Sequence, residues 1–138
     1  MIQLDFWSQF REYAQNHKGN IKLRKAYPQH WYDISFGFST AHIALTVNGK
    51  LKQIACEVYI PDSGWLFSVL FDRKDIIENE LNESLEWNEL PDKKASRIKL
   101  VRSGDIFEQN QWIKHHSWLL EKATQFQNVF GSHIKNLT

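Results

Sequence analysis

The stretch that decides the fold is residues 41–60, which read AHIALTVNGKLKQIACEVYI. Apolar side chains recur at every second position on both sides of Asn48-Gly49. They are Ile43, Leu45 and Val47 before it, and Ile54, Cys56, Val58 and Ile60 after it. A period of two predicts strands with one face on a core. Asn-Gly suits the positive φ angles of a type I′ turn, so we predict a hairpin with a two-residue loop.

A further strand is expected immediately before this hairpin. His30, Tyr32, Ile34 and Phe36 alternate there with Trp31, Asp33 and Ser35. Residues 37–40 supply the turn, which makes the three strands an antiparallel meander. An amphipathic helix is predicted over residues 2–17, with Phe6, Phe10 and Tyr13 at helical spacing. Gly19-Asn20 is expected to end it.

The second half of the chain predicts two helices separated by two strands. The first helix covers residues 64–82 and is interrupted near Asp72. Strands follow at 85–90 and 95–101, around a turn at residues 91–94. The last helix runs over 109–130, with Gly131 as its expected stop. His116 falls on its apolar stripe, which predicts a packed histidine.

These elements predict one α+β domain over residues 1–138: helix, three-stranded antiparallel meander, helix, two further strands, C-terminal helix. The core is expected to include seven side chains in particular. They are Ile34, Ile43, Leu45, Ile54, Val58, Trp112 and Phe126. The order is reminiscent of a degenerate restriction-endonuclease-like core.

Composition places the chain among ordinary globular proteins. Hydrophobic residues make up 42% and charged residues 24% of its 138 residues. The net charge of +1 excludes a nucleic-acid clamp that works by bulk charge. The lone Cys56 suits a reducing cytoplasm. The N-terminus has no signal-peptide pattern and no apolar run reaches the roughly 20 residues of a membrane helix, so we expect a cytoplasmic protein without a membrane partner.

Several blocks of sequence resemble a bacterial and archaeal domain of unknown function, number four-two-six-eight in its series. They are residues 6–10 (FWSQF), 28–32 (PQHWY) with Gly37, 57–60 (EVYI), 85–87 (LEW), 94–98 (KASRI), Trp112, Phe126, Val129 and Phe130. Members of that family often form the C-terminal part of longer proteins whose N-terminal part resembles a nuclease. The resemblance therefore implies a role in nucleic-acid or genome-defence biology, but it implies no particular activity.

A restriction-type nuclease would need a carboxylate on the second strand and a Glu-x-Lys or Asp-x-Lys motif on the third, to hold Mg²⁺ and orient water. The third strand offers Glu57, but Tyr59 stands where the lysine is needed. Residues 41–48 contain no carboxylate. We therefore predict no Mg²⁺-dependent nuclease activity, no cofactor and no catalytic set of this kind.

The meander brings three chemically active residues to one face. A two-residue loop pairs residues whose numbers sum to 97, and the turn at 37–40 pairs residues whose numbers sum to 77. Both registers put His42 diagonal to a carboxylate, Asp33 on one side and Glu57 on the other. These three residues are candidates for a metal or an enzyme site. The alternative is a solvated polar face.

Two stretches rich in Lys and Arg contain no acidic residue, one between Tyr13 and Tyr32 and one between Lys93 and Arg102. Cations beside aromatic rings are what phosphate contact and base stacking require. We predict one phosphate-binding surface, with Trp31 or Tyr32 at its edge. Its cations are Lys22, Arg24, Lys25, Lys94 and Arg97. The alternative is a set of solvated loops.

The function predicted from these patterns is that of a non-catalytic recognition domain. Its partner would be a nucleic acid, or a protein of a nuclease or genome-defence system. The alternative is an enzyme or metal-binding domain that uses Asp33, His42 and Glu57. The oligomeric state is left open.

Overall fold

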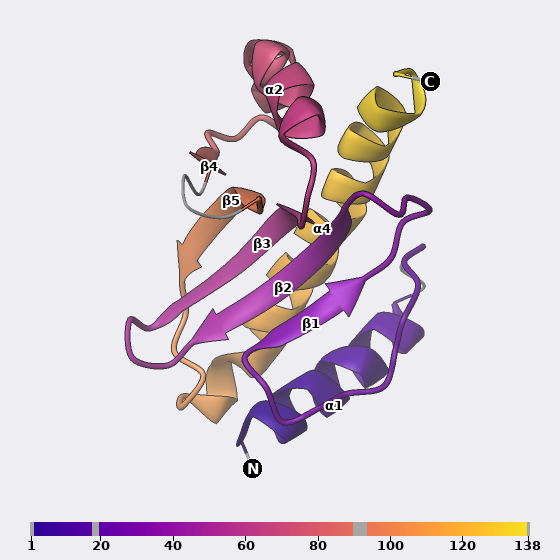
Figure 1. Ribbon diagram of the computed structural model, residues 1–138. Helices are drawn as coiled ribbons and strands as arrows, with labels where there is room; N and C mark the ends of the chain where they lie inside the picture. Colours follow the sequence, from indigo (N-terminus) through magenta and orange to yellow (C-terminus); the bar gives the residue numbers. More distant parts are fainter. Residues whose placement is uncertain (1, 18–19, 90–93, 138) are drawn as a thin grey trace.

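The computed structural model describes residues 2–17, 20–89 and 94–137. Its sheet has five antiparallel strands in the order β1-β2-β3-β5-β4. They are β1 Trp31–Ile34, β2 His42–Asn48, β3 Gln53–Ile60, β4 Glu86–Glu89 and β5 Ser96–Ser103. Two helices, α1 Ile2–Asn16 and α4 Trp112–Lys135, cover the same face of the sheet (Figure 1). The α+β class and the predicted order of elements are confirmed.

Two short helices extend beyond the end of the sheet, beside the C-terminal part of α4 (Figure 1). They are α2 Gly64–Asp72 and α3 Lys74–Leu81, and the predicted interruption near Asp72 lies between them. Ser63 caps α2, because its Oγ accepts a hydrogen bond from the Leu66 N–H at 3.1 Å. The short 3-10 helix Gln109–Gln111 leads into α4.

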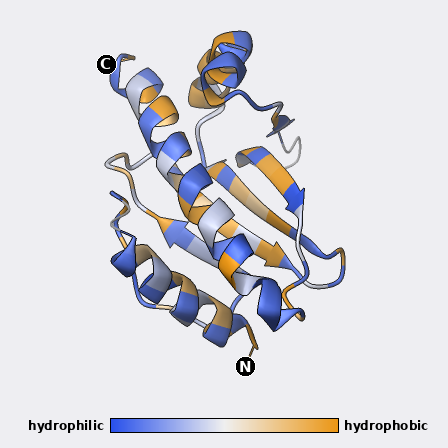
Figure 2. Ribbon diagram, turned by 180° about the vertical axis from the view of Figure 1, so that it is seen from behind, coloured by the Kyte–Doolittle hydropathy of each residue, from blue (hydrophilic) through white to orange (hydrophobic). Residues whose placement is uncertain are grey.

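The core lies between the sheet and the two long helices. Phe6, Trp7 and Phe10 of α1 are fully buried, and the Tyr32 ring stacks on Trp7 with 5.5 Å between the ring centres. All seven side chains predicted to be core residues are buried. Seen from the helical side, hydrophobic and hydrophilic residues alternate along α1 and α4, as expected of helices with one buried face (Figure 2). No helix in the described ranges is both long and apolar enough to cross a membrane.

The predicted two-residue hairpin is wrong. Residues 49–52 form a four-residue connection, and the register pairs His42 with Tyr59 and Asn48 with Gln53. The side chain of Asn48 produces this longer turn, since its Oδ1 accepts the Leu51 N–H at 3.0 Å while Lys52 adopts a φ of 53°. The numbers of paired residues therefore sum to 101 rather than to the predicted 97. The shift of four is even, so every side chain stays on its predicted face.

Two other boundaries differ from the sequence predictions. Gly131 does not end the last helix, which continues to Lys135 because Ile134 adds another buried side chain to its apolar stripe. His30 and residues 35–36 lie outside β1. The predicted glycine break at residue 19 and the predicted turn at 91–93 fall outside the described residues.

Candidate functional site on the open face of the sheet

The helices leave one face of the sheet uncovered, and side chains at alternate strand positions reach it. Asp33, Ala44 and Glu57 form one row across β1, β2 and β3. His42, Tyr59 and Arg97 form the neighbouring row across β2, β3 and β5. The two rows line a hollow of about 310 Å³, together with His30, Trp31 and Thr46. The small side chains of Ala44 and Thr46 leave this space between larger neighbours.

A buried carboxylate holds Arg97 in the hollow. Glu57 is 1% exposed, and both its oxygens accept hydrogen bonds from Arg97 Nη1 at 3.0 Å. The guanidinium carbon also lies 4.7 Å from the centre of the Tyr59 ring. Burial raises the pKa of Glu57, although the charge of Arg97 opposes the rise. Glu57 and Tyr59 thus fix the guanidinium, and neither Nε nor Nη2 donates a hydrogen bond to any described residue.

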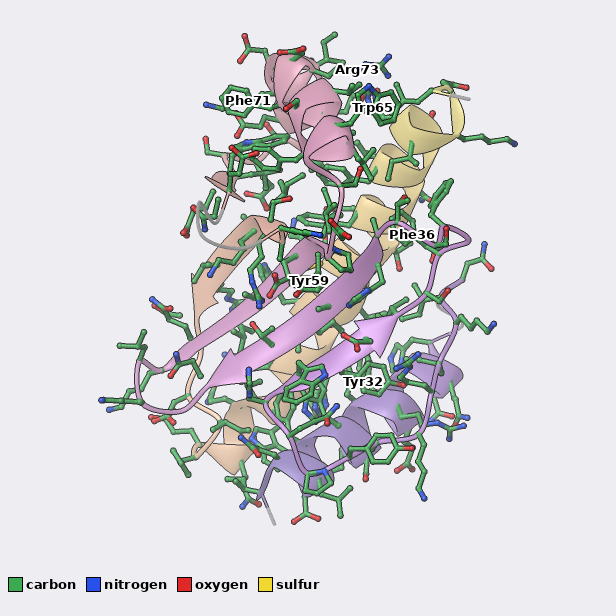
Figure 3. The ribbon with its side chains drawn as sticks, viewed as in Figure 1. Tyr32, Phe36, Tyr59, Trp65, Phe71 and Arg73 are labelled. Atoms are coloured by element: carbon green, nitrogen blue, oxygen red, sulfur yellow. The ribbon has the colours of Figure 1, made fainter. Side chains whose placement is uncertain are left out.

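A second carboxylate orients a histidine on the same face. His42 Nε2 lies 3.2 Å from Asp33 Oδ1, and Arg24 Nη1 lies 3.8 Å from Asp33 Oδ2. The negative charge of Asp33 close to Nε2 favours the tautomer of His42 that carries its proton on Nε2 and its lone pair on Nδ1. The His42 and Tyr59 rings are 5.3 Å apart, and Figure 3 labels Tyr59 in a view onto the open face.

Asp33, His42 and Glu57 all line the hollow, but each carboxylate already has a cationic neighbour. Among the residues that the structure describes, no group of three or more His, Cys, Asp or Glu side chains is placed to hold a metal ion. The structure gives Asp33 and Glu57 roles as partners of His42 and Arg97. β2 carries no carboxylate, and a restriction-type nuclease site would need one there. The expected absence of Mg²⁺-dependent nuclease activity stays a prediction.

The structure brings together part of the predicted basic surface. Arg97 and Trp31, which is 37% exposed, both line the hollow, and Arg24 lies next to it through its contact with Asp33. Lys22 lines a different hollow, as does Gln127 of α4. Lys25 is exposed with Nζ above the Tyr27 ring, and Lys94 is exposed before β5.

Tyr32 does not lie at the edge of this surface. It is 2% exposed and belongs to the opposite, core-facing side of β1. Its hydroxyl donates to the Arg24 carbonyl at 2.6 Å and accepts from the Arg24 N–H at 2.8 Å. Tyr32 therefore holds the backbone of Arg24 from the core side of the sheet and cannot stack on a ligand.

Sequence reasoning missed four residues of the hollow: His30, Ala44, Thr46 and Tyr59. Tyr59 carried a usable signal. It lies two residues after Glu57 on a predicted strand, and such residues share a face. Its contact with His42 depends on the hairpin register, which was predicted wrongly by four, and its contact with Arg97 depends on the pairing of β5 with β3, which the sequence did not supply.

Comparisons with known proteins add a family but no activity. A family model described as a domain of unknown function (DUF4268) matches residues 2–134. No curated protein matches the chain at a significant level. Among solved structures, the chain is similar to YbjN from E. coli, which is described as a proposed transcription regulator. That match has 6% identity and a TM-score of 0.42, and covers 90% of this chain and 92% of YbjN, so it carries no argument about function.

Proposed function

Since the chain belongs to this family of domains of unknown function, we propose a function from the hollow itself: the open sheet face binds single-stranded nucleic acid. Trp31 stacks on a base, while Arg24 and Arg97 contact phosphates. The observation that carries the proposal is that an exposed tryptophan and an anchored arginine line one hollow.

The Arg97 guanidinium is already oriented for binding an anion. It is held by Glu57 and by the Tyr59 ring, so little side-chain freedom is left to lose when a ligand binds. Its N–H groups that donate to no described residue suit two oxygens of one phosphate. Arg24 lies at the border of the hollow, where its Nη1 is 3.8 Å from Asp33 Oδ2.

The hollow favours an unpaired nucleotide over a duplex. A base in a duplex is stacked between its neighbours, whereas a single strand offers the face of each base to an aromatic ring. Trp31 is available for this contact, and His30 packs edge-on against it with 4.7 Å between the ring centres. A nearly neutral chain binds through these local groups rather than through its overall charge.

Removing the stacking ring is expected to weaken binding clearly. Trp31→Ala should cost about 1–3 kcal/mol in the binding of a fluorescently labelled single-stranded RNA or DNA, because one base loses its aromatic neighbour. Anisotropy titrations at low salt measure the effect. Trp65→Ala is the matched control, since Trp65 is 64% exposed on α2 and lines a different pocket.

The same titrations at rising salt test the phosphate contacts. Arg24→Ala should flatten the dependence of affinity on salt and weaken all sequences alike, because phosphates carry no sequence information. Lys114 is an exposed cation on α4, and Lys114→Ala should change neither the affinity nor its dependence on salt. Arg24→Ala/Arg97→Ala should weaken binding further, once a melting curve shows that it is folded. Absence of binding at about 10⁻⁵–10⁻⁴ M protein in low salt would refute the proposal.

A further inference from the structure

We propose that this hollow also cleaves RNA without a metal ion, with His42 as the general base. The inference rests on the nucleic-acid binding proposed above. Its geometric basis is the row formed by His42, Tyr59 and Arg97 on three neighbouring strands. A base and a fixed cation thus face one hollow that is large enough for part of a nucleotide.

The reaction is an internal transfer of the phosphodiester. His42 Nδ1 takes the proton of a ribose 2′-hydroxyl, and the 2′-oxygen attacks the adjacent phosphorus. The bond from phosphorus to the 5′-oxygen breaks, and that oxygen takes a proton from water. The products are a 2′,3′-cyclic phosphate and a free 5′-hydroxyl, and His42 then returns its proton to solvent. No oxidant, reductant or protein nucleophile takes part.

Asp33 makes His42 a suitable base. Its Oδ1 lies 3.2 Å from Nε2, and this negative charge favours the tautomer that carries the proton on Nε2 and the lone pair on Nδ1. The His42 side chain is 31% exposed and lines the hollow, so a substrate can reach it. Asp33 does not need to touch the substrate for this purpose and is a positioning residue.

Arg97 supplies the charge that the transition state needs. Negative charge builds up on the phosphate oxygens during the attack, and a fixed cation stabilises it without first having to reorient. The Tyr59 ring lies between the two groups, 5.3 Å from the His42 ring and 4.7 Å from the Arg97 guanidinium carbon. A phosphate that contacts both groups would therefore lie beside the Tyr59 ring, between the base and the cation.

RNA is the substrate class because its own 2′-hydroxyl is the nucleophile. DNA lacks that group, so the same face would bind single-stranded DNA without cutting it. This difference separates the cleavage proposal from the binding proposal in one experiment.

The test uses an end-labelled DNA oligonucleotide that contains one ribonucleotide, incubated with the protein in excess EDTA. We expect cleavage on the 3′ side of the ribonucleotide, with a 2′,3′-cyclic phosphate identified by mass spectrometry. The same oligonucleotide with a 2′-O-methyl group should bind equally well and stay intact. His42→Ala should lose at least about 100-fold in the rate of cleavage of bound substrate, measured at saturating protein so that any change in affinity does not enter. His17→Ala, an exposed histidine on the loop after α1, should cleave normally when purified in the same way.

The positioning role of Asp33 has its own readout. Asp33→Asn should lower the rate of cleavage of bound substrate more than it changes the affinity. Binding without cleavage, or cleavage that persists in His42→Ala, would overturn the cleavage proposal and leave the binding proposal intact. Absence of binding would overturn both.

Discussion

Replacing Arg97 with methionine is expected to lower the free energy of unfolding by about 3 kcal/mol near neutral pH. Methionine keeps most of the side-chain volume but leaves the Glu57 carboxylate, which is 1% exposed, without its cation. Because the Arg97 end of the pair is 39% exposed, water partly screens the loss and the value lies at the low end for buried pairs. Urea denaturation followed by circular dichroism measures the change.

Two further variants isolate the cause of this destabilisation. Lys99→Met removes a cation that lies directly opposite Glu57 in the register but forms no hydrogen bond with it, and should cost much less. Glu57→Leu combined with Arg97→Met removes both charges and should recover most of the loss. A cost for Arg97→Met equal to that of Lys99→Met would contradict the role assigned to the pair.

The pH dependence of the Arg97→Met effect has a fixed sign. Burial already raises the pKa of Glu57, and removal of Arg97 takes away the main opposing charge. The folded state then holds a proton more strongly than the unfolded state does, so stability falls as the pH rises through the folded pKa. The difference between wild type and Arg97→Met should therefore shrink on acidification.

The alternation of apolar residues was enough to place the open face. The hairpin register was wrong by four, yet Asp33, His42 and Glu57 reach the same hollow, because an even shift preserves the side of the sheet. The predicted pairing of the first two strands, with numbers that sum to 77, agrees with the structure. Trp31 and Tyr32 are consecutive residues of β1, so their side chains point to opposite faces of the sheet, and only Trp31 is exposed.

The contacts that give the site its chemistry could not be predicted from the local sequence pattern. Arg97 meets Glu57 because β5 pairs with β3, although the two residues are 40 positions apart. Arg24 reaches Asp33 because Tyr32 ties the preceding segment to β1. Gly131 is a helix stop by local preference, but packing of Ile134 overrides that preference. Long-range pairing and tertiary packing decide these points.

Acidification from pH 6.5 to about 4 is expected to cost about 3 kcal/mol of stability through His116 alone. The ring is 3% exposed among aromatic side chains, with the Phe6 ring 4.5 Å away. Burial lowers the pKa of His116 to about 4, although its hydrogen bond with the Phe6 carbonyl at 3.0 Å opposes that change. The unfolded chain takes up the proton first as the pH falls. The stabilisation is thus complete above about pH 6.5 and is lost toward pH 4.

Denaturant unfolding at several pH values between 7 and 4 measures this loss, and His116→Phe isolates it. Phenylalanine suits the aromatic surroundings and cannot titrate, so this variant should lose less stability than wild type over the same interval. His115 keeps a smaller contribution of the same sign in both proteins, because burial lowers its pKa as well. His17→Phe is the control for replacing a histidine by phenylalanine outside the core, since His17 is exposed. Equal slopes for wild type and His116→Phe would mean that His116 accepts a proton in the folded core as readily as in the unfolded chain, which its burial should prevent.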